Sequence, residues 1–193
     1  MENREQFIQS ILEIEWSMFQ KVKSATPASC QSNPEAFRKV RASIFDPWPL
    51  EVLSAYLDNL KSAREMGRNL LTEKYARMDN IIPPVNAHPM IDTIVAIESK
   101  WQKEMQDTYP ALYNRVCRSS NEADDGSNFS VYLRCELETY GTETIQRYHE
   151  WVLNGARTNR NYSIESLEAL VRKGGFKSLA QAEDYFTQTN QCM

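Results

Sequence analysis

The chain contains few glycines and prolines, six and eight in 193 residues, and most of the prolines lie between segments with helical periodicity. This scarcity argues against a β-sandwich or a β-barrel, because either fold needs a turn after each short strand. No apolar run approaches the roughly 18 residues that a membrane-spanning helix requires, so we expect no membrane association. With 41% hydrophobic and 25% charged residues, the composition is typical of a globular chain that forms one domain over residues 1–193.

The sequence also lacks an excess of positive charge. It has 22 lysines and arginines against 26 aspartates and glutamates, a formal charge of −4, and no basic stripe, so no nucleic-acid partner is expected. The N-terminal segment MENREQFIQS is charged where an export signal would be apolar, and no two of the four cysteines form a CxxC pair. We therefore expect a cytoplasmic protein with reduced thiols.

Motifs for the common catalytic classes are absent as well. The sequence contains no GxGxxG, GxxxxGK(S/T), GxSxG or HExxH, which disfavours nucleotide-dependent enzymes, serine hydrolases and zincins. Cys30, in the segment PASCQSNP, is a candidate nucleophile that would need a neighbouring base. His88 lies in a proline-rich linker and His149 projects to the outer side of its helix, so an ordinary loop cysteine is the favoured interpretation.

Apolar residues recur with the period of an α-helix in four long segments: 3–24, 49–79, 89–107 and 128–154. Asn33 and Pro34 predict the start of a short helix that ends at Arg41. A further short helix begins at Tyr109 and Pro110, and two more are capped by Ser163 and Ser178. Residues 119–127 lie in the most polar stretch, RSSNEADDGSN, and are predicted to be a mobile loop. We predict an all-α single domain with a four-long-helix core and short additional helices.

Two of the long helices repeat one short pattern. ILEIEWSMF (11–19) and IVAIESKWQ (94–102) both read Ile-x-x-Ile-Glu, followed by an apolar side chain three residues later. Because helical residues advance by about 100° each, Glu15 and Glu98 fall inside the apolar stripe of their helices rather than opposite it. The pattern therefore predicts one core-facing carboxylate on each of these two helices.

The other two long helices add a carboxylate and a cation to the same predicted interior. In the fourth segment Glu136 falls among apolar positions near Tyr140, and in the second Lys74 falls on the packed face with Arg64 and Gly67. An unpaired buried charge costs several kcal/mol, so opposite charges on facing helices are expected. We predict that Lys74 meets the inward glutamates, and that Gly67 allows a neighbouring helix or a ligand to approach closely.

Five stretches of the sequence resemble the motifs of a bacterial family designated domain of unknown function 4125: EWSMFQ (15–20), ASCQ (28–31), GRNLLTEKYARM (67–78), IVAIESKW (94–101) and YLRCELETY (132–140). The similarity extends from about residue 13 to the end of the sequence, and LTEKYARM and YLRxEL are its more specific parts. The resemblance implies a bacterial, cytoplasmic protein and no transferable activity. Its motifs include Glu15, Lys74, Glu98 and Glu136, which the helical projection also selects.

Two functional interpretations follow from the predicted cluster. The favoured one is a module that binds a small polar ligand or a protein partner through these candidate site residues: Glu15, Arg64, Lys74, Glu98, Glu136 and Tyr140. The alternative is a carboxylate-based enzyme, with or without a metal, since helical bundles build di-iron sites from inward glutamates. Those sites also use Glu-x-x-His pairs, and neither histidine follows an inward glutamate by three residues. We therefore predict no metal and no cofactor. The simplest non-functional explanation of the buried charges is a structural salt-bridge network.

Overall fold

The computed structural model describes residues 3–23, 33–118 and 128–190. These residues form ten helices and no strand, which confirms the predicted all-α class. The predicted mobile loop 119–127 and Cys30 lie outside them. The helices are α1 (Arg4–Phe19), α2 (Pro34–Phe45), α3 (Leu50–Glu65), α4 (Leu70–Met78), α5 (Met90–Thr108), α6 (Pro110–Val116), α7 (Phe129–Leu137), α8 (Thr142–Arg157), α9 (Tyr162–Lys173) and α10 (Leu179–Asn190).

Half of the helices begin at an asparagine that caps them. In each case the side-chain oxygen accepts a hydrogen bond from a backbone N–H in the first turn, a group that has no partner within the helix. These capping residues are Asn3, Asn33, Asn69, Asn128 and Asn161. Asn69 also donates from Nδ2 to the backbone oxygen of Met18 at 2.9 Å, so this cap fastens the start of α4 to the end of α1.

The expected long helix over residues 49–79 is two helices, α3 and α4. Gly67 has a φ of +71° and ends α3 in a Schellman motif, with N–H groups of Gly67 and Arg68 donating to the oxygens of Arg64 and Ala63 at 3.1 and 2.8 Å. Gly67 is exposed, and a Cβ atom added to it would meet nothing within 4 Å. The prediction of close packing at Gly67 is therefore wrong, because this glycine serves the backbone turn instead.

The expected long helix over residues 128–154 is also divided, into α7 and α8. Gly141, the N-cap of α8, donates its backbone N–H to Asn59 Oδ1 at 2.8 Å. A Cβ atom at this position would lie 2.8 Å from the same oxygen, so a larger residue would force the Asn59 side chain to move. The break allows α8 to pack on α3 and α5, while α7 packs on α4 and α5.

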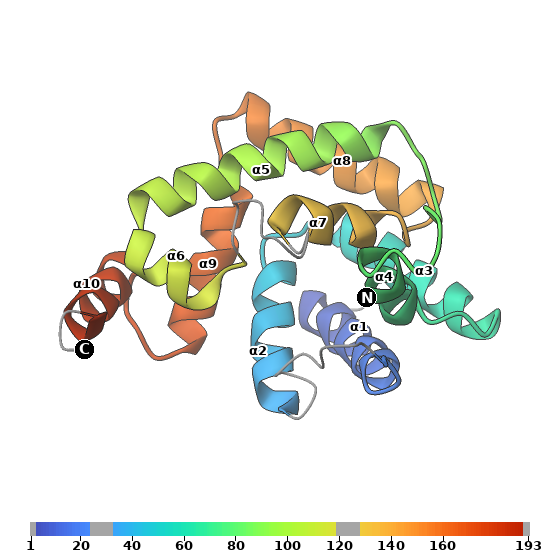
Figure 1. Ribbon diagram of the computed structural model, residues 1–193, viewed down its shortest axis with the longest axis horizontal. Helices are drawn as coiled ribbons and strands as arrows, with labels where there is room; N and C mark the ends of the chain where they lie inside the picture. Colours follow the sequence, from blue (N-terminus) through green and yellow to red (C-terminus); the bar gives the residue numbers. More distant parts are fainter. Residues whose placement is uncertain (1–2, 24–32, 119–127, 191–193) are drawn as a thin grey trace.

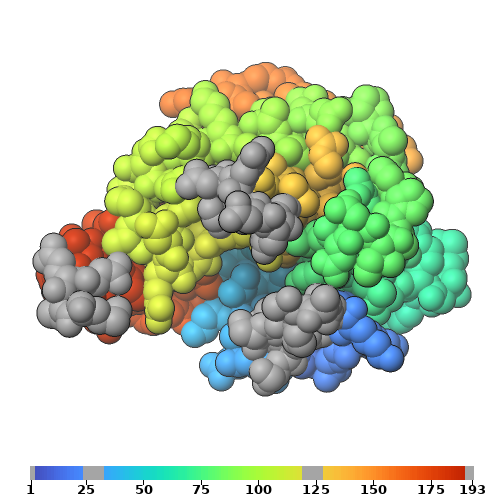
Figure 2. Space-filling model, viewed as in Figure 1, coloured from blue at the N-terminus to red at the C-terminus, as the bar shows by residue number. Residues whose placement is uncertain are grey.

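The helices surround two hydrophobic cores. In Figure 1, α5 and α8 run along one side of the molecule, and α7 lies between α5 and the group formed by α1, α2 and α4. The larger core fills this region and includes the fully buried Ile11, Leu53, Leu60 and Ile94. The smaller core lies where the end of α5 meets α6, α9 and α10, and α10 and α3 mark opposite ends of the molecule (Figures 1 and 2). None of the described helices combines the length and the apolar character that crossing a membrane would require.

Replacing Gly67 should test the backbone origin of the first helix break. We expect Gly67→Ala to lower the free energy of unfolding by about 1–2 kcal/mol, because a Cβ atom disfavours the left-handed conformation while meeting no neighbour. Gly67→Asn should lower the free energy of unfolding by less, since asparagine tolerates this conformation. Urea unfolding followed by circular dichroism measures both. Equal losses for the two variants would contradict this origin.

Candidate functional site

The carboxylate of Glu136 on α7 lies between two cationic side chains from other helices. Its Oε1 accepts a hydrogen bond from Arg41 Nη2 on α2 at 2.8 Å and one from the Tyr140 hydroxyl at 3.1 Å. Its Oε2 accepts from Lys74 Nζ on α4 at 3.0 Å. Glu136 and Lys74 are 8% and 5% exposed, so the predicted buried salt bridge is confirmed.

Arg41 joins this carboxylate to that of Glu15. Arg41 Nε and Nη2 donate to the two oxygens of Glu15 at 2.8 and 2.5 Å, a bidentate pair. Glu15 is fully buried and also accepts from the Tyr56 hydroxyl at 2.7 Å. The inward orientation predicted for Glu15 is therefore correct, but its cation is Arg41 rather than Lys74.

Arg41 is not among the candidate site residues that the sequence predicts. The short helix expected from residue 34 ends at this residue, whereas α2 continues to Phe45. A usable signal was present, because Phe37, Arg41 and Phe45 are spaced four residues apart and share one face of a helix. Both phenylalanines are buried, and the guanidinium carbon of Arg41 lies 4.8 Å from the ring centroid of Phe45.

Lys74 is surrounded by polar groups and an aromatic ring on the otherwise apolar, packed face of α4. Besides its bond to Glu136, Nζ donates to the Tyr132 hydroxyl at 2.8 Å, and it lies 4.0 Å from the Tyr132 ring centroid. These contacts replace the hydration that a buried ammonium group loses. They explain why a lysine is stable at this position.

The cluster formed by Glu15, Arg41, Lys74 and Glu136, hereafter the charge cluster, contains two positive and two negative side chains. Burial by itself lowers the pKa of Arg41 and of Lys74, but the combined attraction of neighbouring groups, of which Glu136 contributes most, outweighs burial and raises both pKa values above their ordinary range. Burial likewise opposes ionisation of Glu136, yet Arg41 and Lys74 hold its pKa well below the usual range. All three groups therefore stay charged at neutral pH.

Glu98 on α5 does not join these ion pairs. It is 8% exposed and accepts a hydrogen bond from the Tyr148 hydroxyl at 2.6 Å, and no cation of the described residues forms a salt bridge with it. Burial raises the pKa of Glu98 to about 7, Tyr148 opposes this rise, and the charge of Glu136 adds to it. The expectation that Lys74 would meet Glu98 is wrong, because Glu136 and Tyr132 already surround the lysine ammonium.

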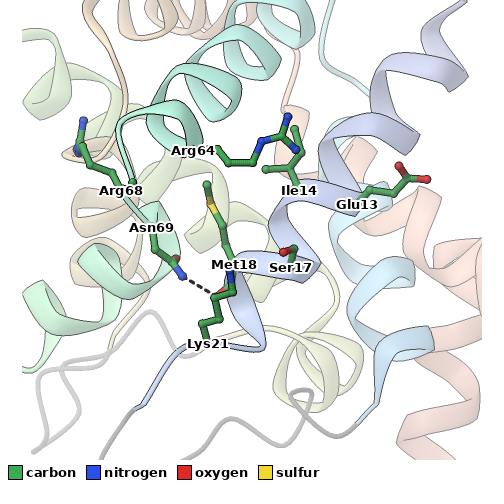
Figure 3. Close-up of a pocket in the computed structure, with 9 residues that line it drawn as sticks. Glu13, Ile14, Ser17, Met18, Lys21, Arg64, Arg68 and Asn69 are labelled. Carbon is green, nitrogen blue, oxygen red and sulfur yellow. Dashed lines mark hydrogen bonds between the residues drawn. The ribbon is translucent and has the colours of Figure 1, made fainter.

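Arg64 lies away from the charge cluster. It is exposed near the end of α3 and lines a cavity of about 280 Å³ with Glu13, Ser17 and Arg68, among others. Figure 3 shows that the Arg64 and Arg68 side chains extend in different directions from the chain, so these cations do not converge on one point. The prediction that Arg64 shares the side of Lys74 is wrong, because the turn at Gly67 changes the direction of the chain between them.

The charge cluster is open on one side to a different cavity, of about 300 Å³, hereafter the cluster cavity. Its polar lining comes from Arg41, Lys74, Tyr132 and Glu136, together with Tyr56 and Thr139. The rest is mainly apolar and includes side chains from three helices, namely Phe19, Phe37, Val40, Leu70 and Leu71. The cavity thus combines a polar patch with apolar walls, as small-molecule sites do.

The carboxylates of the cluster are poorly arranged for a metal ion. Within the described ranges no group of three or more histidine, cysteine, aspartate or glutamate side chains could hold one. Glu15 and Glu136 are both bound by Arg41, and Lys74 occupies the remaining oxygen of Glu136. A cation entering here would compete with two resident positive charges.

The chain belongs to the family described as Protein of unknown function (DUF4125), which it matches over residues 5–184. This range contains the whole charge cluster and confirms the family resemblance of the sequence motifs. No curated protein and no solved structure matches the chain.

Removing the Lys74 ammonium should destabilise the fold. We expect Lys74→Met to cost about 3 kcal/mol, because a buried and ionised Glu136 loses one of its two cations. The loss should be smaller in a Glu136→Gln background, where no carboxylate is left unpaired. Denaturant unfolding of the two single variants and the double variant measures this coupling. Lys61→Met, at an exposed position of α3, is the control, and a similar cost for both lysines would contradict the expectation.

Glu98 should give stability a pH dependence that can be isolated by substitution. The folded chain keeps the Glu98 proton up to about pH 7, whereas an unfolded chain releases it near the ordinary pKa of 4.5. The contribution of Glu98 is therefore fully present below pH 4.5 and is lost as the pH rises through 7. Between pH 4.5 and 7.5 the wild type should lose about 1–3 kcal/mol more than Glu98→Gln.

Thermal and urea unfolding across this pH range would measure the difference between wild type and Glu98→Gln. Glu13→Gln, which changes an exposed carboxylate on α1, should leave the pH dependence of the wild type unchanged. Parallel curves for wild type and Glu98→Gln would contradict a raised pKa.

Proposed function

We propose that this DUF4125 protein is a binding module that takes up a small molecule in the cluster cavity. One observation carries the proposal: the buried ion pairs of Arg41, Lys74 and Glu136 line a cavity of about 300 Å³ instead of being enclosed by the core. This volume lies at the lower end of the roughly 300–1,000 Å³ typical of ligand pockets. It suits a small molecule better than a segment of a protein partner.

The charge cluster gives less stability than apolar residues could provide, so a purely structural role does not explain it. Replacing a buried ion pair by apolar residues of similar volume is often neutral or stabilising, so such pairs are weak evidence for stability. The sequence nevertheless places four charged residues from α1, α2, α4 and α7 against one another, and three of them line a cavity. Orienting a polar ligand is a role that apolar residues could not fill.

Binding is favoured over carboxylate catalysis because of the state of the two relevant glutamates. Glu136, which lines the cavity, is held as an anion by two cations, so it is a poor proton donor or acceptor near pH 7. Glu98 has a pKa suited to proton transfer but is not among the residues that line the cavity. No single group therefore combines a suitable pKa with access to a bound molecule there.

Closing the cavity at its rim should abolish ligand binding without disturbing the core. Val40 lines the cluster cavity and is 44% exposed, so Val40→Trp should fill the entrance while the helix remains folded. Val116 on α6 is 40% exposed and lies outside the cavity lining, which makes Val116→Trp the matched control. The experiment is a screen of the wild type by 1H–15N NMR with a fragment library that includes acids, amines and neutral molecules.

Fragments that bind should shift the backbone resonances of Arg41, Lys74 and Tyr132. The same fragments should cause no such shifts in Val40→Trp but should still cause them in Val116→Trp. A screen in which no fragment shifts these resonances, or in which Val40→Trp binds the hits as well as the control, would overturn the proposed function.

A further inference from the structure

If the cluster cavity binds a small molecule, as proposed above, the free hydrogen-bonding groups of its polar lining restrict what that molecule can be. The acceptor groups are mostly engaged. Glu136 accepts two hydrogen bonds at Oε1 and one at Oε2, from Arg41, Tyr140 and Lys74. Arg41 and Lys74 are held by α2 and α4, and Tyr140 lies between α7 and α8, so a ligand N–H group that displaces none of them has only the second lone pair of Oε2 left.

The donor groups, by contrast, are not exhausted. Lys74 has three N–H groups and uses two of them, toward Tyr132 and Glu136. The Tyr132 hydroxyl accepts from Lys74, and its own O–H donates to no residue that the structure describes. Arg41 donates through Nε and Nη2, while its Nη1 group has no partner in the described part of the chain.

These free donors are accessible and lie close to one another. Among the described residues the one fully buried side-chain nitrogen or oxygen without a partner is Asn59 Nδ2, so Arg41 Nη1 is not sealed from solvent. Arg41 and Lys74 bind the two oxygens of the same Glu136 carboxylate, and Tyr132 lies within a hydrogen bond of Lys74. The side chains of Arg41, Lys74 and Tyr132 all line the cluster cavity.

The charge balance of the cluster decides between the possible acceptors. Arg41 and Lys74 are already neutralised by Glu15 and Glu136, so an anion would bring a third negative charge next to two positive ones. Burying an uncompensated charge is costly, and a dianion such as a phosphate ester is disfavoured most. A cationic ligand would meet mainly donor groups, whereas it needs acceptors. An uncharged oxygen acceptor satisfies the free donors and leaves the balance intact.

We infer that the ligand of this cavity is an uncharged carbonyl compound with a compact apolar body. Its carbonyl oxygen accepts from Tyr132, Lys74 or Arg41, and its apolar part packs against Phe37, Leu71 and their neighbours. One nearby cation favours an anion instead: the guanidinium carbon of Arg118 lies 4.5 Å from the Tyr132 ring centroid. The test therefore includes an anion of the same shape.

The experiment compares three molecules that share a benzyl body: phenylacetamide, phenylacetate and phenethylammonium. Each is titrated into the wild type, and Kd is measured from the shifts of the cavity resonances in 1H–15N NMR spectra. Phenylacetamide should bind about fivefold more tightly than phenylacetate and at least about tenfold more tightly than phenethylammonium, the range that one or two net hydrogen bonds provide.

Tyr132→Phe should then weaken phenylacetamide about fivefold, because it removes one free donor without changing the charge of the cluster. Tyr109→Phe, in the smaller core, is the matched control and should leave the Kd unchanged. Tightest binding of phenylacetate or of phenethylammonium would overturn the inferred class while supporting the cavity as a ligand site. If none of the three molecules binds while other fragments bind in the cluster cavity, the inferred ligand class would also be overturned. A fragment screen without cavity hits would overturn the proposed function itself.

Discussion

The carboxylate of Glu136 is the constraint on which the arrangement of three helices depends. It is almost fully buried, so it must be paired, and its two cations come from α2 and α4, which are 95 and 62 residues away in the chain. Satisfying this one charge fixes how α2 and α4 approach α7. Because Arg41 also holds Glu15, the same constraint extends to α1. The four helices therefore meet around a polar centre within an otherwise apolar core.

The two helix breaks make this convergence possible. A continuous helix over residues 50–78 would be about 43 Å long at 1.5 Å per residue, and its second half would continue along the axis of α3. The left-handed turn at Gly67 instead redirects the chain, so that α4 packs on α1 and α7 with Lys74 facing Glu136. The break at Gly141 likewise lets α8 pack on α3 while α7 remains beside α4.

Glu136 and Glu98 show how the surroundings decide the behaviour of identical side chains. Both are 8% exposed and lose most of their hydration, which by itself favours the neutral carboxylic acid. Two cations reach Glu136, and they lower its pKa despite burial. Glu98 has a tyrosine hydroxyl instead, and its pKa rises to about 7. The larger core thus contains one glutamate that stays ionised and one that titrates near neutrality.

The sequence by itself determined the helical class, most helix starts and the burial of individual residues. Helical periodicity is a local property, and it placed Glu15, Lys74, Glu98, Glu136 and Tyr140 on buried faces before any partner was known. Local signals for the first break were also present, because Gly67 is followed after one residue by the capping Asn69. Only the tertiary structure decided which charges meet. Arg41 rather than Lys74 pairs with Glu15, Glu98 has no cation, and Arg64 faces another cavity, because pairing depends on the angles and offsets between helices that periodicity does not contain.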